Sequence, residues 1–118
     1  MKIKNIFAAL RNLETIRPDE LNELLGEKTV TPIDVNARNS WHRARVPGAW
    51  HLNPKDFGED ELPWDKDRLL VFYCSNPMCQ KAPNAAQRAR QMGYQKVKVM
   101  SAGISGWLSR KLPVESGV

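Results

Sequence analysis

The sequence predicts an α/β fold in which helices cover both faces of a parallel sheet. Short apolar segments alternate along the chain with segments whose apolar residues follow helical periodicity. The segment 69–73 (LLVFY) is apolar throughout, which is typical of a strand buried on both faces of a parallel sheet. A polar loop and a helix-forming segment follow it, so the centre of the chain has the order strand, loop, helix.

Length and composition restrict the classes of function. A chain of 118 residues suits one domain, and 42% hydrophobic residues are ordinary for a globular protein. No apolar run approaches the ~20 residues of a membrane span, and the N-terminus lacks a signal-peptide pattern. We therefore expect a cytoplasmic protein whose two cysteines are thiols or a redox pair. The only histidines are His42 and His51, so no closed zinc site is expected.

The net charge of +5 does not by itself indicate nucleic-acid binding. The basic residues are spread over every segment, and neither aromatic–basic interleaving nor a nucleic-acid-binding motif is present. A mild positive field instead favours small anionic substrates or an acidic protein partner.

Residues 1–16 are predicted to form an amphipathic helix, and we divide the chain into an N-terminal arm, 1–15, and a folded domain, 16–118. The favoured interpretation is an arm packed on the domain. A dimer contact or association with a membrane surface is the alternative. The apolar residues of this helix recur at spacings of three and four: Ile3, Ile6, Phe7, Leu10 and Leu13.

The next two elements are a helix and a strand. Pro18 opens the helix, with two acidic residues in its first turn, and Gly26 is expected to end it. The segment 29–35 is predicted to be a strand, at an edge or with a bulge, because Pro32 cannot donate to a sheet ladder. Asp34, near the end of this strand, either orients groups of an active site or caps a turn.

The remaining segments complete the alternation of helices and strands. The sequence predicts a short helix over 39–45, a short strand over 50–53 and a polar loop over 54–67. A last strand over 95–100 and a helix over 101–108 follow the central unit. Five large side chains are expected to serve packing, the last three of them under the polar loop: Trp41, Trp50, Phe57, Leu62 and Trp64.

Cys74 directly follows the buried strand 69–73. Pro83 suits a first helical turn, and the helix-forming segment 84–92 ends at Gly93. Ligands of open α/β sheets bind at the carboxyl ends of strands, where a helix N-terminus and a curled loop favour negative charge. Such surroundings bring a cysteine pKa from about 8.5 to roughly 3.5–7.5. Cys74 is therefore the candidate nucleophile; the alternative is a buried cysteine that acts as a small hydrophobe.

Several short segments, in the same order and spacing, resemble a single-domain rhodanese, a sulfurtransferase. They are 16–21 (IRPDEL), 33–36 (IDVN), 45–52 (RVPGAWHL), 71–74 (VFYC), 85–86 (AA), 91–94 (QMGY), 102–107 (AGISGW) and 112–114 (LPV). The resemblance runs from Ile16 to Val114. It implies a rhodanese-like fold, with a parallel central sheet of about five strands and helices on both faces.

The resemblance also implies a reaction that needs no cofactor and no metal. The Cys74 thiolate would attack the outer sulfur of thiosulfate or a similar small sulfur-containing anion, sulfite would leave, and a persulfide would form. A thiol, cyanide or a protein acceptor would then take the sulfur. The loop that would hold the persulfide with its N–H groups comprises Ser75, Asn76, Pro77, Met78, Cys79 and Gln80.

Three positions depart from the family's pattern, and the first of them, Pro77, removes one N–H from the loop. Cys79 stands where many members have an arginine, which leaves Lys81 as the nearest cation. Asn36 stands where the family often has an arginine, which leaves Arg38 or Arg45 as the substrate-side charge.

The second cysteine leaves further interpretations open. Cys79 either attacks a persulfide or sulfenate on Cys74 to give a disulfide, or it is a passive loop thiol or a residue at the helix start that packs inward. For the whole chain, the alternatives are a non-catalytic rhodanese-like binding or regulatory module, a Cys74/Cys79 thiol–disulfide switch, and a cysteine phosphatase or arsenate reductase. The last would need an arginine that closes the loop, at positions held here by Gln80 and Lys81.

Overall fold

A computed structural model describes residues 13–118, and in it five strands form one parallel sheet in the order β1-β5-β4-β2-β3. The strands are β1 (Glu14–Thr15), β2 (Val30–Asp34), β3 (Trp50–His51), β4 (Leu69–Tyr73) and β5 (Val97–Val99). The helices are α2 (Pro18–Glu27), α3 (Arg38–Arg43), α4 (Lys81–Gln91) and α5 (Gly103–Ser109), with a 3₁₀ turn η1 at Glu59–Glu61. The predicted fold class is confirmed. Within residues 13–118, no helix is both long and apolar enough to cross a membrane.

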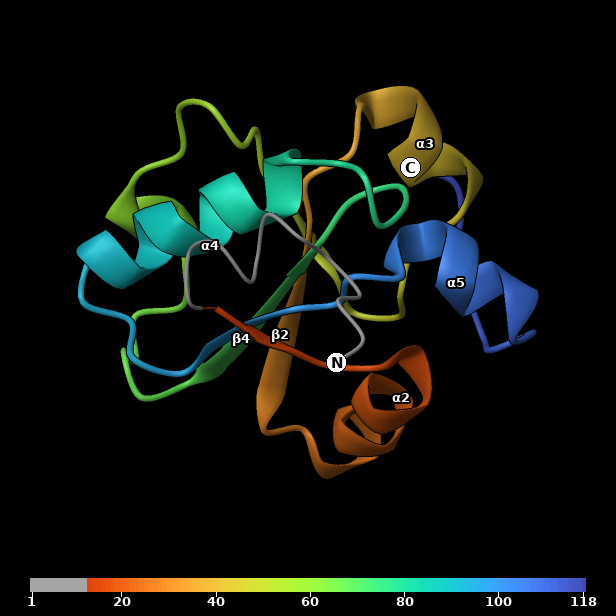
Figure 1. Cartoon of the computed structure of the whole chain (residues 1–118), viewed down its shortest axis with the longest axis horizontal. Helices are drawn as coiled ribbons and strands as arrows, with labels where there is room; N and C mark the ends of the chain where they lie inside the picture. The colour runs from red at the N-terminus through yellow and green to blue at the C-terminus, as the bar shows by residue number, and fades with distance from the viewer. Residues whose placement is uncertain (1–12) are drawn as a thin grey trace.

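Strand β4 lies at the centre of the sheet and is buried on both faces. Leu70 and Phe72 pack on the side of α4, whereas Val71 and Tyr73 pack on the side of α2 and α5. Figure 1 shows α4 covering one face of the sheet and α2 with α5 covering the other. The side of α4 that meets the sheet consists of small residues, which lets the helix backbone lie close to the strands: Ala82, Ala85, Ala86 and Ala89.

Strand β2 is an internal strand, so the prediction of an edge or bulge at Pro32 is wrong. Pro32 pairs in regular register with Val71 of β4. Backbone groups of a parallel strand point alternately to its two neighbours. Val35 N–H donates to β4 at Tyr73, so Pro32 faces the opposite side, towards β3. Because β3 begins at Trp50, opposite Ile33, no strand of the sheet needs the N–H that Pro32 lacks.

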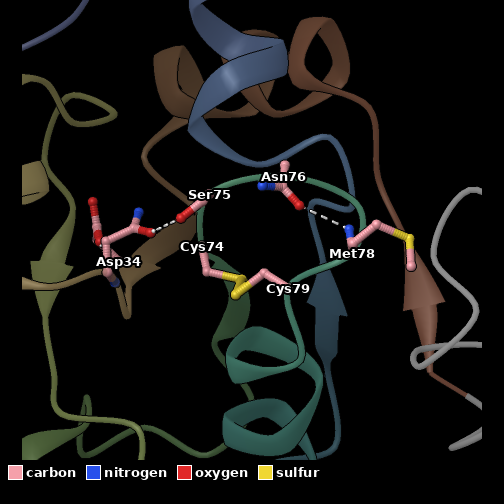
Figure 2. Close-up of a disulfide and its surroundings, with 7 residues drawn as sticks. Asp34, Cys74, Ser75, Asn76, Met78 and Cys79 are labelled. Carbon is pink, nitrogen blue, oxygen red and sulfur yellow. Dashed lines mark hydrogen bonds between the residues drawn. A yellow bond between two sulfur atoms is a disulfide. The ribbon is translucent and has the colours of Figure 1, made fainter.

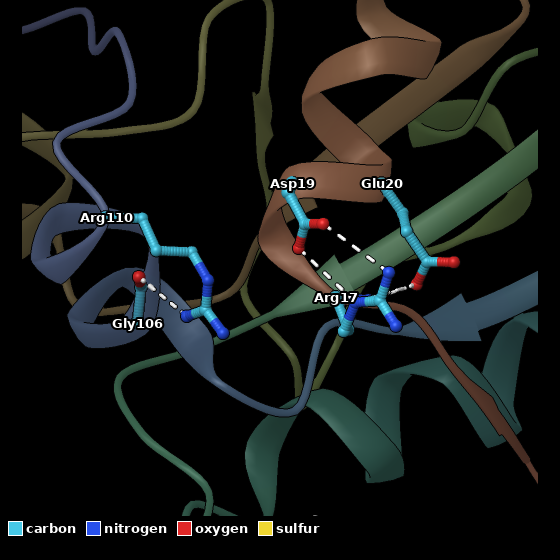
Figure 3. A network of polar contacts seen from close by, with 5 residues as sticks. All are labelled: Arg17, Asp19, Glu20, Gly106 and Arg110. Carbon is cyan, nitrogen blue, oxygen red and sulfur yellow. Dashed lines mark hydrogen bonds and ion pairs between the residues drawn. The ribbon is translucent and has the colours of Figure 1, made fainter.

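Helix α2 begins at Pro18 as predicted, but it does not end at Gly26. The helix continues to Glu27, and Lys28 takes the left-handed conformation, with φ +59°. At the other end the Glu20 carboxylate accepts the Arg17 N–H at 3.0 Å, and the Arg17 side chain pairs with Asp19 (Figure 3). These contacts satisfy a free N–H and place negative charge at the positive end of the helix.

Two other predictions need correction. The helix predicted over 1–16 lies mostly outside the described residues, but Glu14–Thr15 form strand β1, because the edge of β5 offers them a hydrogen-bonding partner. In the loop before β4, Phe57 and Leu62 are buried as predicted, whereas Trp64 is 91% exposed. Its ring extends into solvent instead of packing under the loop.

Candidate active site

Cys74 lies at the carboxyl end of β4, where the chain leaves the sheet and turns towards α4. Its carbonyl oxygen accepts the N–H of Ile104 at 2.9 Å, and the carbonyl of Ser75 accepts the N–H of Ser105 at 3.0 Å. The first turn of α5 is therefore docked onto the start of the loop. Gly103 makes this approach possible, because its φ is +65° and a Cβ at this position would lie 2.5 Å from the carbonyl carbon of Ser75.

The loop from Ser75 to Gln80 curls back, and a disulfide joins Cys74 to Cys79 (Figure 2). Asn76 organises this turn: its side-chain oxygen accepts the N–H of Met78 at 2.9 Å and its carbonyl accepts the N–H of Cys79 at 3.1 Å. Pro77 has no N–H to offer. In the disulfide form, Pro77, Met78 and Cys79 therefore have no free N–H. These are half of the six loop residues whose N–H groups the resemblance implied would hold the persulfide.

The two cysteines are less exposed than Asn76, Pro77, Met78 and Gln80. Cys74 is 3% exposed and belongs to the apolar cluster between the sheet and α4, and Cys79 is partly buried against the same cluster. Met78 is 70% exposed, and Figure 2 shows its side chain pointing away from the disulfide. Gln80 is exposed at the N-cap of α4. The middle of the loop is thus exposed to solvent, and the two cysteine side chains are turned inward.

A chain of hydrogen bonds connects this loop to the end of β2. The Ser75 hydroxyl donates to Asn36 Oδ1 at 2.9 Å, and the Asn36 N–H donates to Asp34 Oδ1 at 2.8 Å. Asp34 is fully buried, and burial raises the pKa of its carboxyl above 3.8. His51 Nε2 is hydrogen-bonded to the carbonyl oxygen of Asn36 at 2.8 Å. Asp34 therefore positions Asn36, which in turn holds the first residue of the loop.

An open cleft of about 710 Å³ lies next to the loop, at Asn36 and Lys81, but neither Cys74 nor any residue from Ser75 to Gln80 lines it. It contains Arg38 and Lys81, two of the predicted supporting cations, together with Lys55. Arg45 is not in this cleft: its guanidinium donates to the carbonyls of Trp41 and Gly117 and stacks on the Trp41 ring. The remaining lining residues are Val35, Asn36, Ala37, His51, Leu52, Asn53, Pro54, Asp56 and Glu61.

Asn36 is a functional candidate that the sequence reasoning treated only as a missing arginine. It is 3% exposed, its Oδ1 accepts the Ser75 hydroxyl, it lines the cleft, and its side-chain Nδ2 has no hydrogen-bond partner within residues 13–118. An unpaired buried amide is costly, and this nitrogen is itself closed off from solvent. Its position directly after a strand end was the available signal, since such residues face the ligand side of a parallel sheet.

The profile of the rhodanese-like domain matches residues 17–110, which is most of the chain. The protein belongs to the rhodanese-like family. Among curated relatives of this rhodanese-like chain, the thiosulfate sulfurtransferase GlpE of Glaesserella parasuis is 24% identical over 102 residues, covering 86% of this chain and 93% of that protein. GlpE of Shewanella oneidensis is 28% identical over 89 residues, covering 75% and 86%. An HTH-type transcriptional regulator of Mycobacterium tuberculosis is 29% identical over 109 residues, but this chain spans only 45% of it.

Solved structures agree with the rhodanese-like fold. A Bacillus halodurans protein superposes with a TM-score of 0.79 at 22% identity, covering 92% of this chain and 80% of that one. A thiosulfate sulfurtransferase from Pseudomonas aeruginosa gives a TM-score of 0.75 at 22% identity, covering 89% of this chain but 20% of that one. A Rhodopseudomonas palustris protein described as a possible tyrosine phosphatase gives 0.75 at 22%, covering 91% and 88%. At these identities the structures establish the fold alone.

Proposed function

We propose that this protein is a sulfurtransferase in which the reduced form of Cys74 takes a sulfane sulfur from a small anion and passes it on as a persulfide. The observation that supports this most is the position of Cys74 at the carboxyl end of the central strand, directly before a curled loop and the N-terminus of α4. That is the end of a parallel sheet at which ligands bind, and the end of a helix that favours negative charge.

The reaction has two steps. In the first, the Cys74 thiolate attacks the outer sulfur of thiosulfate, the sulfur–sulfur bond of the donor breaks, and its electron pair leaves with sulfite. In the second, a thiol or other thiophilic acceptor attacks the outer sulfur of the persulfide and frees Cys74. Because a disulfide does neither, the Cys74–Cys79 bond must be reduced before the first step.

The cleft beside the loop supports an anionic donor. Arg38, Lys55 and Lys81 line it, and Lys81 is the first residue of α4, two positions after Cys79. Two carboxylates, Asp56 and Glu61, also line the cleft, so its cations serve to orient a small anion rather than to form a uniformly positive surface.

Intact mass spectrometry of the reduced protein after exposure to thiosulfate tests this proposal. The protein is reduced with a phosphine, desalted without oxygen and mixed with thiosulfate. We expect stoichiometric sulfite from the wild type and a gain of about one sulfur mass, removable by cyanide, in Cys79→Ser. Cys74→Ser should give neither. Sulfite release that persists in Cys74→Ser, or its absence from every reduced form, would contradict the proposal, and hydrolysis of a phosphotyrosine analogue instead would favour a phosphatase.

A further inference from the structure

The second cysteine of the loop is held where it can attack the first. The Cys74–Cys79 disulfide joins residues whose Cα atoms are 6.5 Å apart, a separation that ordinary disulfides span. The turn between them is fixed by the two hydrogen bonds that Asn76 accepts and by Pro77. Both ends are anchored as well, at Cys74 through the N–H of Ile104 and after Cys79 by the start of α4.

The burial pattern places the Cys79 side chain on the inner side of the loop. Asn76, Pro77, Met78 and Gln80 are exposed, whereas Cys79 is partly buried and packs against the apolar cluster that contains Cys74. The Cys79 sulfur is bonded to the same Cys74 Sγ that would carry a transferred sulfur.

We propose that Cys79 is a second catalytic residue, a resolving thiol that expels the transferred sulfur as hydrosulfide. This step rests on the proposed function, because it needs the persulfide. The Cys79 thiolate attacks the Cys74 Sγ, a Cys74–Cys79 bond forms, and the bond between Cys74 Sγ and the outer sulfur breaks. The outer sulfur leaves with the electron pair as HS⁻, so the sulfane sulfur is reduced to sulfide while two thiols are oxidised to a disulfide.

The products follow from this balance. One reduced chain and one thiosulfate give one sulfite, one hydrosulfide and one disulfide-bonded chain. Another turnover requires a dithiol reductant, small or protein-borne, that reopens the bond between Cys74 and Cys79. In this scheme the structure with the disulfide is the state that follows sulfur release.

A single-turnover experiment separates this inference from the proposed function. Reduced, desalted wild-type protein is mixed with thiosulfate in the absence of oxygen and of any added thiol. Sulfite, sulfide trapped with a bimane reagent, and intact mass are then measured. We expect about one equivalent each of sulfite and sulfide and a mass two hydrogens below that of the dithiol protein. Cys79→Ser and Cys79→Ala should release no sulfide and keep a stable persulfide on Cys74.

Three results would overturn the inference. A wild-type chain that gives sulfite and keeps a persulfide on Cys74, without sulfide, leaves the proposed function intact and refutes the resolving thiol. A persulfide that migrates to Cys79 without sulfide release refutes attack on the Cys74 Sγ. If no reduced form releases sulfite, both the proposed function and the inference fail. Release of sulfite with or without sulfide from the wild type decides whether the inference stands, so the decision does not depend on the folding of the Cys79 variants.

Discussion

The replacement Gly103→Ala tests how closely α5 docks onto the loop that starts at Cys74. Gly103 has φ +65°, and an added Cβ would lie 2.5 to 2.7 Å from backbone atoms of Ser75 and Asn76. The positive φ costs an alanine roughly 1–2 kcal/mol. The overlap with the loop backbone adds roughly 1–3 kcal/mol, as overpacking of a well-packed site does. The free energy of unfolding should therefore fall by roughly 2–5 kcal/mol.

Urea unfolding measures this change. With a slope of about 2 kcal/mol per molar urea, the midpoint should fall by roughly 1–2.5 M. Gly48→Ala is the matched control, because Gly48 has φ +76° but no atom within 4 Å of an added Cβ. It should lose only the conformational term, about 1–2 kcal/mol. Gly26→Ala, inside α2 with open space around it, should instead gain about 0.5–1 kcal/mol.

The difference between the Gly103 and Gly48 variants isolates the contact between α5 and the loop. Because that contact sets the start of the loop, Gly103→Ala should also slow the release of sulfite by the reduced protein, whereas Gly48→Ala should not. Equal losses of stability in the two variants, together with equal rates of sulfite release, would refute the reasoning.

Two further predictions concern the cleft and the buried carboxyl. Lys81→Ala should raise the thiosulfate concentration needed for half-maximal sulfite release several-fold. Lys96→Ala is the control and should not raise it, because Lys96 lies just before β5, at the amino ends of the strands. Equal effects of the two replacements would contradict a local role for Lys81. Burial raises the pKa of Asp34 above 3.8, so just above pH 3.8 the folded wild type binds more protons than the unfolded chain. The free energy of unfolding of the wild type therefore falls as the pH rises from 3.8 to the raised pKa of Asp34. The Asp34→Asn side chain does not ionise and can still accept the Asn36 N–H. The difference between its urea midpoint and that of the wild type should therefore increase, in favour of the variant, between about pH 3 and about pH 7. A difference that stays constant over this range would contradict the expectation.

The elements with strong local signals were predictable from sequence. The predicted strand 69–73 coincides with β4, because five consecutive apolar residues leave no exposed face. The predicted helix over 84–92 corresponds to α4, which begins slightly earlier, at Lys81, and places Pro83 in its first turn. The position of Cys74 between these two elements followed from the same local information.

Features that depend on distant partners were not predictable. Strand β1 exists because β5 offers it an edge, and Pro32 is tolerated inside the sheet because β3 is short. Neither fact is visible in the residues around them. Trp64 is exposed although its apolar ring predicted burial. The tendency of apolar residues to be buried is a statistical one, and it does not fix the direction of a single side chain in a loop.

The candidate site was predictable in outline but not in its connections. The loop and the two cysteines were identified from their place after β4, and the disulfide brings together the pair whose role remained open. The choice between Arg38 and Arg45 required the fold, which places Arg38 in the cleft and binds Arg45 to the carbonyls of Trp41 and Gly117. The contact between Asn36 and Ser75 joins residues far apart in the chain, and no sequence spacing reports it.

The docking of α5 onto the carbonyls of Cys74 and Ser75 has a consequence for synthesis of the protein. A ribosome makes the chain from its N-terminus, so Cys74 emerges before the segment 103–105 that holds its backbone. During that interval the nascent cysteine is an ordinary thiol, without the hydrogen bonds that set its direction. The backbone around Cys74 is thus fixed only after translation has passed well beyond this residue.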